Sequence, residues 1–218
     1  MRKCILSFVL AASFVLALPT SVFAQLSGTY TIDANGSGTT NYSSFTAALS
    51  ALTTNGVNGP VIFNVASGTY TEQIAIPAIT GSSSTNSITF QANPANTSPA
   101  EITYSPTGST DNWTIHLNAT NNIIIKGLKI TSGGSTYGRL ITYTGSSDIQ
   151  ILDNTMIGAA TGSSTSSNLA AFYYQVSTGY PSGTWRVQGN SVTNVSYGFY
   201  LRGSSTTSMD TLYLEDNT

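Results

Sequence analysis

The chain has 218 residues, and its 7 basic and 9 acidic residues give a formal net charge of −2. Charged residues make up only 7% of the chain and form no basic run, which excludes nucleic acid and anionic membrane surfaces as expected partners. Serine, threonine, asparagine and glycine take the place of charge, but isoleucine, valine, tyrosine and phenylalanine recur throughout, which excludes a disordered chain and favours an extracellular all-β protein.

The first segment has the features of a secretory signal peptide. Arg2 and Lys3 precede an apolar run, and a small-residue site predicts cleavage after Ala24, so residues 1–24 are expected to be removed. A membrane anchor is the alternative, but the apolar run is shorter than the ~20 residues that a spanning helix needs. The one cysteine lies inside this segment, so the mature chain has no disulfide. We expect a bacterial protein, secreted or held at the cell surface, with no membrane span in its mature chain.

Residues 41–56 contain the one convincing helix of the sequence. The apolar residues on one stripe of this helix are Phe45, Leu49 and Leu52. Ser43 or Ser44 is the expected N-cap, and Gly56 is the expected end. Residues 25–60 are therefore predicted to form an N-terminal strand and a helical cap, because the first coil of a repeat fold exposes a strand edge that needs cover.

From residue 61 onward, a short apolar phrase returns at regular intervals. Bulky apolar residues alternate with polar ones in each phrase, which indicates a strand with one buried face. The first inward residues are Val61, Ile88, Ile123, Ile149, Trp185 and Leu212, at intervals of 27, 35, 26, 36 and 27 residues. This period predicts a solenoid whose coils stack about 4.8 Å apart. Residues 61–218 are expected to form its coils, and the chain stops inside a strand phrase, as a C-terminally truncated fragment would.

A bend is expected after each of these strands. Most phrases end in glycine or aspartate followed by asparagine, as at Asp153 and Asn154, and such residues tolerate a left-handed backbone. The longer intervals contain Ser/Gly/Thr-rich loops at 105–112 and 158–168. A second strand in the coils is expected within 137–146, 170–179 and 195–205.

Four asparagines fall in one column of the repeat: Asn93, Asn154, Asn190 and Asn217. They could form a polar binding row on the surface. The alternative, which we favour, is an inward structural ladder in which the side-chain amides bond from coil to coil.

The N-terminal part resembles a known family. The segments at 33–52 and 59–76 combine a glycine-rich start, a short helix, a strand and a Gly-x-Tyr-x-Glu motif at Gly68, Tyr70 and Glu72. This arrangement is similar to the opening of pectinesterases, in the pectin-lyase-like superfamily, and to large secreted repeat proteins of Bacteroidetes-type bacteria. The resemblance implies an all-β, right-handed parallel β-helix with a short N-terminal capping α-helix. It also implies contact with carbohydrate, although the same scaffold serves adhesins.

The catalytic motifs of that superfamily do not carry over to this sequence. Pectinesterases combine a glutamine-rich strand, two aspartates and an Arg-Pro-Trp segment, and the related hydrolases combine clustered aspartates with Gly-His-Gly. Neither set occurs, and no Asp or Ser motif accompanies the single histidine, His116. We therefore assign no catalytic residue, no metal site and no cofactor.

Five outward-facing residues are the candidates for binding a sugar chain: Tyr173, Tyr200, Tyr213, Arg186 and Arg202. Tyrosine rings can stack on sugar faces, and arginine can hold a uronate carboxylate in a fork. The alternative is that these tyrosines are good strand residues on a solvated face.

The sequence thus favours a secreted, non-catalytic β-helix module that contacts polysaccharide or serves adhesion, and we expect a monomer. The alternative is a polysaccharide-degrading enzyme whose active groove is incomplete in this segment. A purely structural spacer differs from the first reading only by having no ligand.

Overall fold

The structure is a computed structural model that describes residues 24–160, 165–175, 183–202 and 211–218. Apart from Ala24, the expected signal peptide lies outside the described residues. The regular secondary structure of the described chain is almost entirely β-strand, with one α-helix, α1 (Phe45–Asn55), and one short 3₁₀ helix, η1 (Ser167–Leu169).

The strands form three sheets. The first sheet has β1 (Leu26–Ile32), β2 (Asn41–Tyr42), β3 (Val57–Val65), β6 (Ile88–Ala92), β9 (Asn121–Lys126), β12 (Ser147–Leu152), β15 (Thr184–Gln188) and β18 (Thr211–Glu215). The second sheet has β4 (Gly68–Thr71), β7 (Ala100–Tyr104), β10 (Lys129–Ser132), β13 (Thr155–Ile157) and β16 (Ser191–Thr193). The third sheet has β5 (Ile74–Ile76), β8 (Ile115–Asn118), β11 (Ile141–Thr144), β14 (Ala170–Gln175) and β17 (Tyr197–Arg202).

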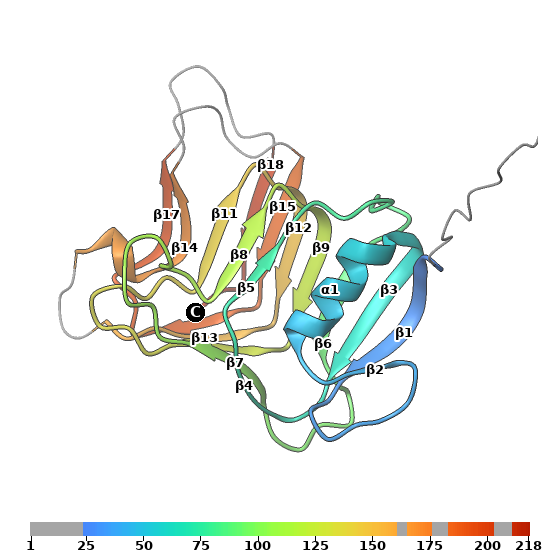
Figure 1. Cartoon of the computed structure of the whole chain (residues 1–218). Helices are drawn as coiled ribbons and strands as arrows, with labels where there is room; N and C mark the ends of the chain where they lie inside the picture. Colours follow the sequence, from blue (N-terminus) through green and yellow to red (C-terminus); the bar gives the residue numbers. More distant parts are fainter. Residues whose placement is uncertain (1–23, 161–164, 176–182, 203–210) are drawn as a thin grey trace, which may run out of the picture.

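The chain visits the three sheets in turn and then returns to the first, beside the strand it left (Figure 1). Five successive coils each place one strand in every sheet, and β18 begins another coil. All neighbouring strands are parallel. Crossovers between parallel strands of one sheet are right-handed in nearly all proteins, because the right-handed twist of the strands favours that path. The protein is therefore a right-handed parallel β-helix with one N-terminal helix, as predicted from the sequence.

The register of the first sheet is the one that the repeat predicts. The six inward residues chosen from the sequence pair directly in the order Val61, Ile88, Ile123, Ile149, Trp185 and Leu212. The first five are at most 2% exposed. A period-2 pattern specifies register strongly when one face is buried, because a slip of one residue would turn the apolar face toward water. The alignment of the coils is confirmed.

The bends after these strands adopt the left-handed backbone that their residues tolerate. Gly127 (φ 66°), Asp153 (φ 55°), Gly189 (φ 68°) and Asp216 (φ 53°) end β9, β12, β15 and β18. Glycine and aspartate are used here because a β-branched residue would be strained at such angles. The predicted turn chemistry is confirmed.

Helix α1 packs against the first coils and covers their N-terminal end (Figure 1). The Ser44 side chain accepts the Ala47 N–H at 3.0 Å, and Gly56 (φ 68°) ends the helix. Ser44 is therefore the N-cap among the two serines that the sequence allowed. The predicted apolar stripe lies in the core, with Phe45 against Tyr70 and Phe90 at ring distances of 5.3 and 6.0 Å.

Glu72 ties the start of this helix to the first coil. Its carboxylate accepts the backbone N–H groups of Phe45 (3.0 Å) and Thr46 (2.9 Å), and also the Thr46 hydroxyl (2.6 Å). These N–H groups have no partner within the helix, and the helix dipole favours a negative charge beside them.

We expect Glu72→Gln to lower the free energy of unfolding by about 1–3 kcal/mol, because the helix start loses the charged acceptor of three hydrogen bonds, of which the one from the Phe45 N–H is part-buried. Denaturant titration measures this change. Asp153→Asn is the matched control, since the carboxylate of Asp153 forms only an exposed 4.0 Å ion pair with Lys126. Equal effects of the two substitutions would contradict the capping role.

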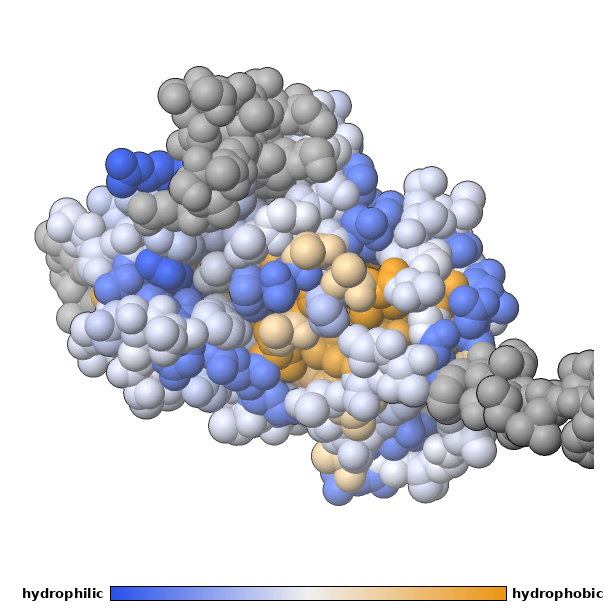
Figure 2. All heavy atoms as spheres, turned by 45° about the horizontal axis from the view of Figure 1, so that its top comes forward, coloured by the Kyte–Doolittle hydropathy of each residue, from blue (hydrophilic) through white to orange (hydrophobic). Residues whose placement is uncertain are grey.

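The surface is polar but carries few charges. Figure 2 shows one face on which hydrophilic and near-neutral residues frame an apolar area. Among the described residues, the large hydrophobic side chains with high exposure are Tyr213 (41%) and Leu214 (47%), both on β18. No helix in the described ranges is both long and apolar enough to span a bilayer.

Candidate functional site

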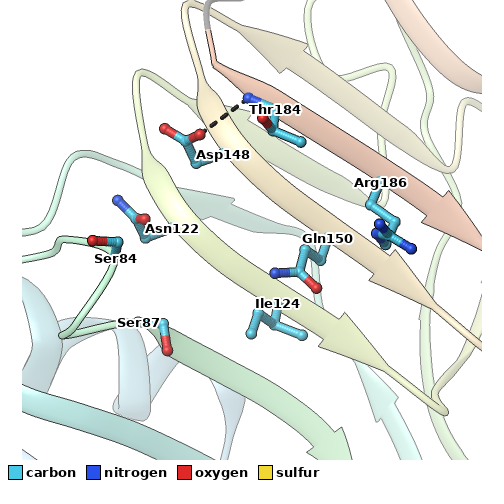
Figure 3. Close-up of a pocket in the computed structure, with 8 residues that line it drawn as sticks. All are labelled: Ser84, Ser87, Asn122, Ile124, Asp148, Gln150, Thr184 and Arg186. Atoms are coloured by element: carbon cyan, nitrogen blue, oxygen red, sulfur yellow. Dashed lines mark hydrogen bonds between the residues drawn. The ribbon is translucent and has the colours of Figure 1, made fainter. Parts of the chain in front are cut away.

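A cavity of about 400 Å³ opens on the outer face of the first sheet (Figure 3). Its walls come from β9, β12, β15 and the segment between β5 and β6. The lining residues are Ser84, Ser87, Asn122, Ile124, Asp148, Gln150, Thr184 and Arg186. Its size falls within the range of small-molecule sites in proteins.

Strand alternation places most of these side chains. On β9, β12 and β15, the inward residue of each phrase is buried, so the next residue points outward. One outward row, in direct register across the three coils, is Ile124, Gln150 and Arg186. A second row, one place before the inward residues, is Asn122, Asp148 and Thr184. The two rows make the floor of the cavity, while Ser84 and Ser87 lie on its side (Figure 3).

The second row contains two residues in the left-handed region, Asn122 (φ 54°) and Asp148 (φ 53°). The Asp148 carboxylate accepts the backbone N–H of Thr184 in the next coil at 3.0 Å. A Cβ on Gly183 would lie 2.6 Å from this carboxylate, so glycine is needed for the close approach. Two adjacent coils therefore hold a polar side chain at the cavity edge, each in the left-handed conformation that asparagine and aspartate tolerate.

Arg186 lies in the cavity, but its charge is already balanced. Its guanidinium is 2.9 Å from the Glu215 carboxylate and 3.2 Å from the Gln188 side-chain oxygen. The guanidinium carbon is also 5.0 Å from the centre of the Tyr213 ring. Glu215, Gln188 and Tyr213 thus orient Arg186 along the sheet.

The five candidate residues from the sequence separate into two groups. Arg186 and Tyr213 are neighbours on the first sheet, and Arg186 lines the cavity. Tyr173, Tyr200 and Arg202 lie on β14 and β17 of the third sheet, where the pairing sets Tyr173 beside Tyr200. The structure therefore does not bring the five together into one site.

The two candidate tyrosines on the third sheet use their ring faces within the protein. Tyr173 and Tyr200 stack at 5.4 Å with an interplanar angle of 4°. The Arg139 guanidinium carbon lies 3.2 Å from the centre of the Tyr173 ring, and Tyr197 meets Tyr200 edge-on at 5.5 Å. Because a sugar stacks on a ring face, this arrangement leaves Tyr173 little capacity for such a contact.

Three of the four column asparagines bond from coil to coil. The Asn154 side chain accepts the Leu128 N–H at 2.9 Å and donates to the Ile125 carbonyl at 3.0 Å. In the next coil, the Asn190 side-chain oxygen accepts both the backbone and side-chain N–H groups of Asn154, at 2.9 and 3.0 Å. The Asn217 side chain repeats this pattern toward Asn190. Each amide thereby pairs the polar groups of the preceding bend.

Asn93 does not join this row. Its side-chain oxygen accepts the N–H of Ala95, two residues further on, in a local turn. The strands of the first coils run further, with Val65 paired to Ala92, so the bend lies later in the chain. Asn96 takes the bridging role there and bonds to the Ser67 N–H and the Val65 carbonyl, both at 3.0 Å.

His116 lies on the third sheet, away from the cavity. Its ring is 4.9 Å from that of Trp113, and burial lowers its pKa. It shares a 3.2 Å hydrogen bond with the Thr144 hydroxyl. Within the described residues, no group of three or more His, Cys, Asp or Glu side chains is placed to hold a metal ion.

Six of the lining residues follow from the repeat pattern in the sequence, although only one of them was among the candidates. They occupy the positions immediately before and after the inward residues at 123, 149 and 185. Only Arg186 was chosen from them, because aromatic and cationic residues were preferred over amides and hydroxyls. Ser84 and Ser87 come from a connecting segment whose path has no periodic signature.

In comparisons with known proteins, the chain is similar only to solved structures. No family model and no curated protein matches the chain. The crystal structure of deglycosylated pectin methylesterase from Aspergillus niger is similar with a TM-score of 0.42 and 15% identity, over 91% of this chain and 88% of that one. A second structure of that enzyme, in a penultimately deglycosylated form, is similar with a TM-score of 0.42 and 16% identity, over 90% and 87%.

Proposed function

We propose that this chain is a secreted, non-catalytic module that binds a polysaccharide in the cavity on the first sheet, and that it does so as a monomer. The observation that carries the proposal is the cavity lining, in which seven of the eight side chains are polar. Amides, hydroxyls and a carboxylate are the groups that exchange hydrogen bonds with sugar hydroxyls. Ile124 adds an apolar contact for the carbon face of a sugar ring.

The charged groups of the cavity favour binding over hydrolysis. Enzymatic cleavage of a glycosidic bond ordinarily uses two carboxyl groups that flank the bond. Asp148 is the one carboxylate among the lining residues, and Arg186 is engaged by Glu215. The proposed signal peptide at residues 1–24 delivers the module to the extracellular space, where polysaccharides occur.

We expect Gln150→Ala to weaken glycan binding about five- to tenfold, because one amide that exchanges hydrogen bonds with the ligand is lost. A glycan array identifies the ligand, and titration calorimetry measures its affinity. Thr193→Ala is the control, since Thr193 is exposed on the second sheet and should leave affinity unchanged.

A reducing-sugar assay on the full-length protein with the bound glycan completes this test. Binding without release of product supports the proposal. Release of product would instead favour the degrading enzyme. Equal weakening by Gln150→Ala and Thr193→Ala would place the binding site elsewhere.

A further inference from the structure

We infer that the cavity selects an uncharged, hydroxyl-rich polysaccharide and discriminates against polyuronates. The inference rests on the proposed function, because it names the ligand class of the same site. It follows from how the charged side chains around the cavity are paired. A free Arg186 would favour a uronate, whereas an Arg186 that is already paired does not.

The cations on the outer face of the first sheet already have acidic partners. Arg186 pairs with Glu215 at 2.9 Å, and Lys126 pairs more loosely with Asp153 at 4.0 Å. Arg186 also donates a hydrogen bond to the Gln188 side-chain oxygen and contacts the Tyr213 ring, and both interactions hold it in the direction of Glu215. A uronate that approached Arg186 would have to displace Glu215 and would meet that carboxylate as a like charge.

Asp148 is the charged group of the cavity that has no ion-pair partner among the described residues. One of its oxygens accepts the Thr184 N–H, and its close approach to Gly183 fixes the carboxylate at the cavity edge. The remaining lone pairs can accept hydroxyl groups of a neutral sugar, and carboxylate acceptors form strong hydrogen bonds with such donors. The same charge repels a ligand carboxylate.

The neutral lining residues are suited to the same ligand. Asn122 and Gln150 each present an amide that can both donate and accept, and Ser84, Ser87 and Thr184 add hydroxyls. These groups match the mixed donor and acceptor pattern of sugar hydroxyls. They do not provide the cluster of fixed cations that a polyanion requires.

The test uses calorimetric titration of the full chain at low salt, with two probe sets. One set contains neutral oligosaccharides of glucose, galactose, xylose and arabinose, and the other contains oligogalacturonate. We expect at least one neutral oligosaccharide to bind at least tenfold more tightly than oligogalacturonate. The double variant Asp148→Asn/Glu215→Gln should raise the affinity for oligogalacturonate at least tenfold, because it removes the repelling carboxylate and releases Arg186.

Asp216→Asn is the matched control, since Asp216 is exposed, has φ 53° as Asp148 does, and belongs neither to the cavity lining nor to an ion pair of the described residues. It should leave both affinities unchanged, and thermal melts verify that each variant folds. A wild-type preference for oligogalacturonate, or no gain in the double variant, would overturn the inference and leave the proposed function standing. Absence of binding to either probe set would overturn both.

Discussion

Replacing Asn154 with alanine is expected to lower the free energy of unfolding by about 3–5 kcal/mol. The side chain is 1% exposed, and its amide bonds to the Leu128 N–H, the Ile125 carbonyl and the Asn190 side-chain oxygen. Alanine leaves these buried groups without a partner, and each such group costs about 1–3 kcal/mol. Water cannot easily replace the amide at the buried centre of the row. Denaturant-induced unfolding followed by circular dichroism measures the change.

Asn217→Ala is the matched comparison. Asn217 makes the corresponding bonds, to the Asn190 N–H groups and the Val187 carbonyl, but it is only half-buried. Water can therefore replace its amide, and we expect a loss of about 1 kcal/mol. If the two substitutions lower the free energy of unfolding by the same amount, burial is not the source of the stabilisation by the asparagine row.

The register of the coils could be predicted because it depends on the burial of one apolar strand face. Each phrase has bulky apolar residues at alternate positions, and only one alignment buries all of them. Trp185 follows Ile149 in this alignment although 36 residues separate them, because the connections from β13 to β14 and from β14 to β15 are longer than those of the preceding coil. The helix could be predicted for a similar reason, since its stripe, N-cap and terminal glycine are all local signals.

The position of each bend was harder to predict than the register. Asn93 occupies the expected column by sequence, yet the longer pairing of Val65 with Ala92 carries the strand past the usual bend. The bridging side chain is therefore Asn96, three residues later. How far a strand continues depends on its neighbour in space, which a single phrase does not contain.

The candidate site could be predicted only in part, because residue type does not reveal which surfaces are already occupied. Tyr173 and Tyr200 have the side chains expected for sugar stacking, but they stack on each other. Arg186 has the side chain expected for a uronate, but Glu215 from the next coil neutralises it. These contacts form between coils, so they depend on the three-dimensional arrangement. Asp148 was missed because an isolated aspartate near a strand is also ordinary turn chemistry.

Phe90→Ala is expected to lower the free energy of unfolding by about 3–5 kcal/mol, the usual cost of removing a buried phenylalanine. The side chain is 1% exposed and stacks on Phe63 at 5.0 Å, with Phe45 of α1 at 6.0 Å. The ring thus links the helix to the first sheet at the N-terminal end of the core. Truncation leaves a cavity that the rigid, stacked coils cannot close. Thermal and denaturant unfolding measure the loss.

Phe199→Ala provides the comparison, since Phe199 stacks on Phe172 at 4.7 Å but is only partly buried on β17. Each variant loses one stacked ring contact. The difference between their losses of unfolding free energy therefore reports the deeper burial of Phe90 and its contact with α1. We expect Phe199→Ala to cost about 1–2 kcal/mol, because less apolar surface is removed from the core and water already reaches the site. A cost for Phe90→Ala no larger than this would mean that the contact between Phe90 and Phe45 of α1 does not add to the stability of the first coils.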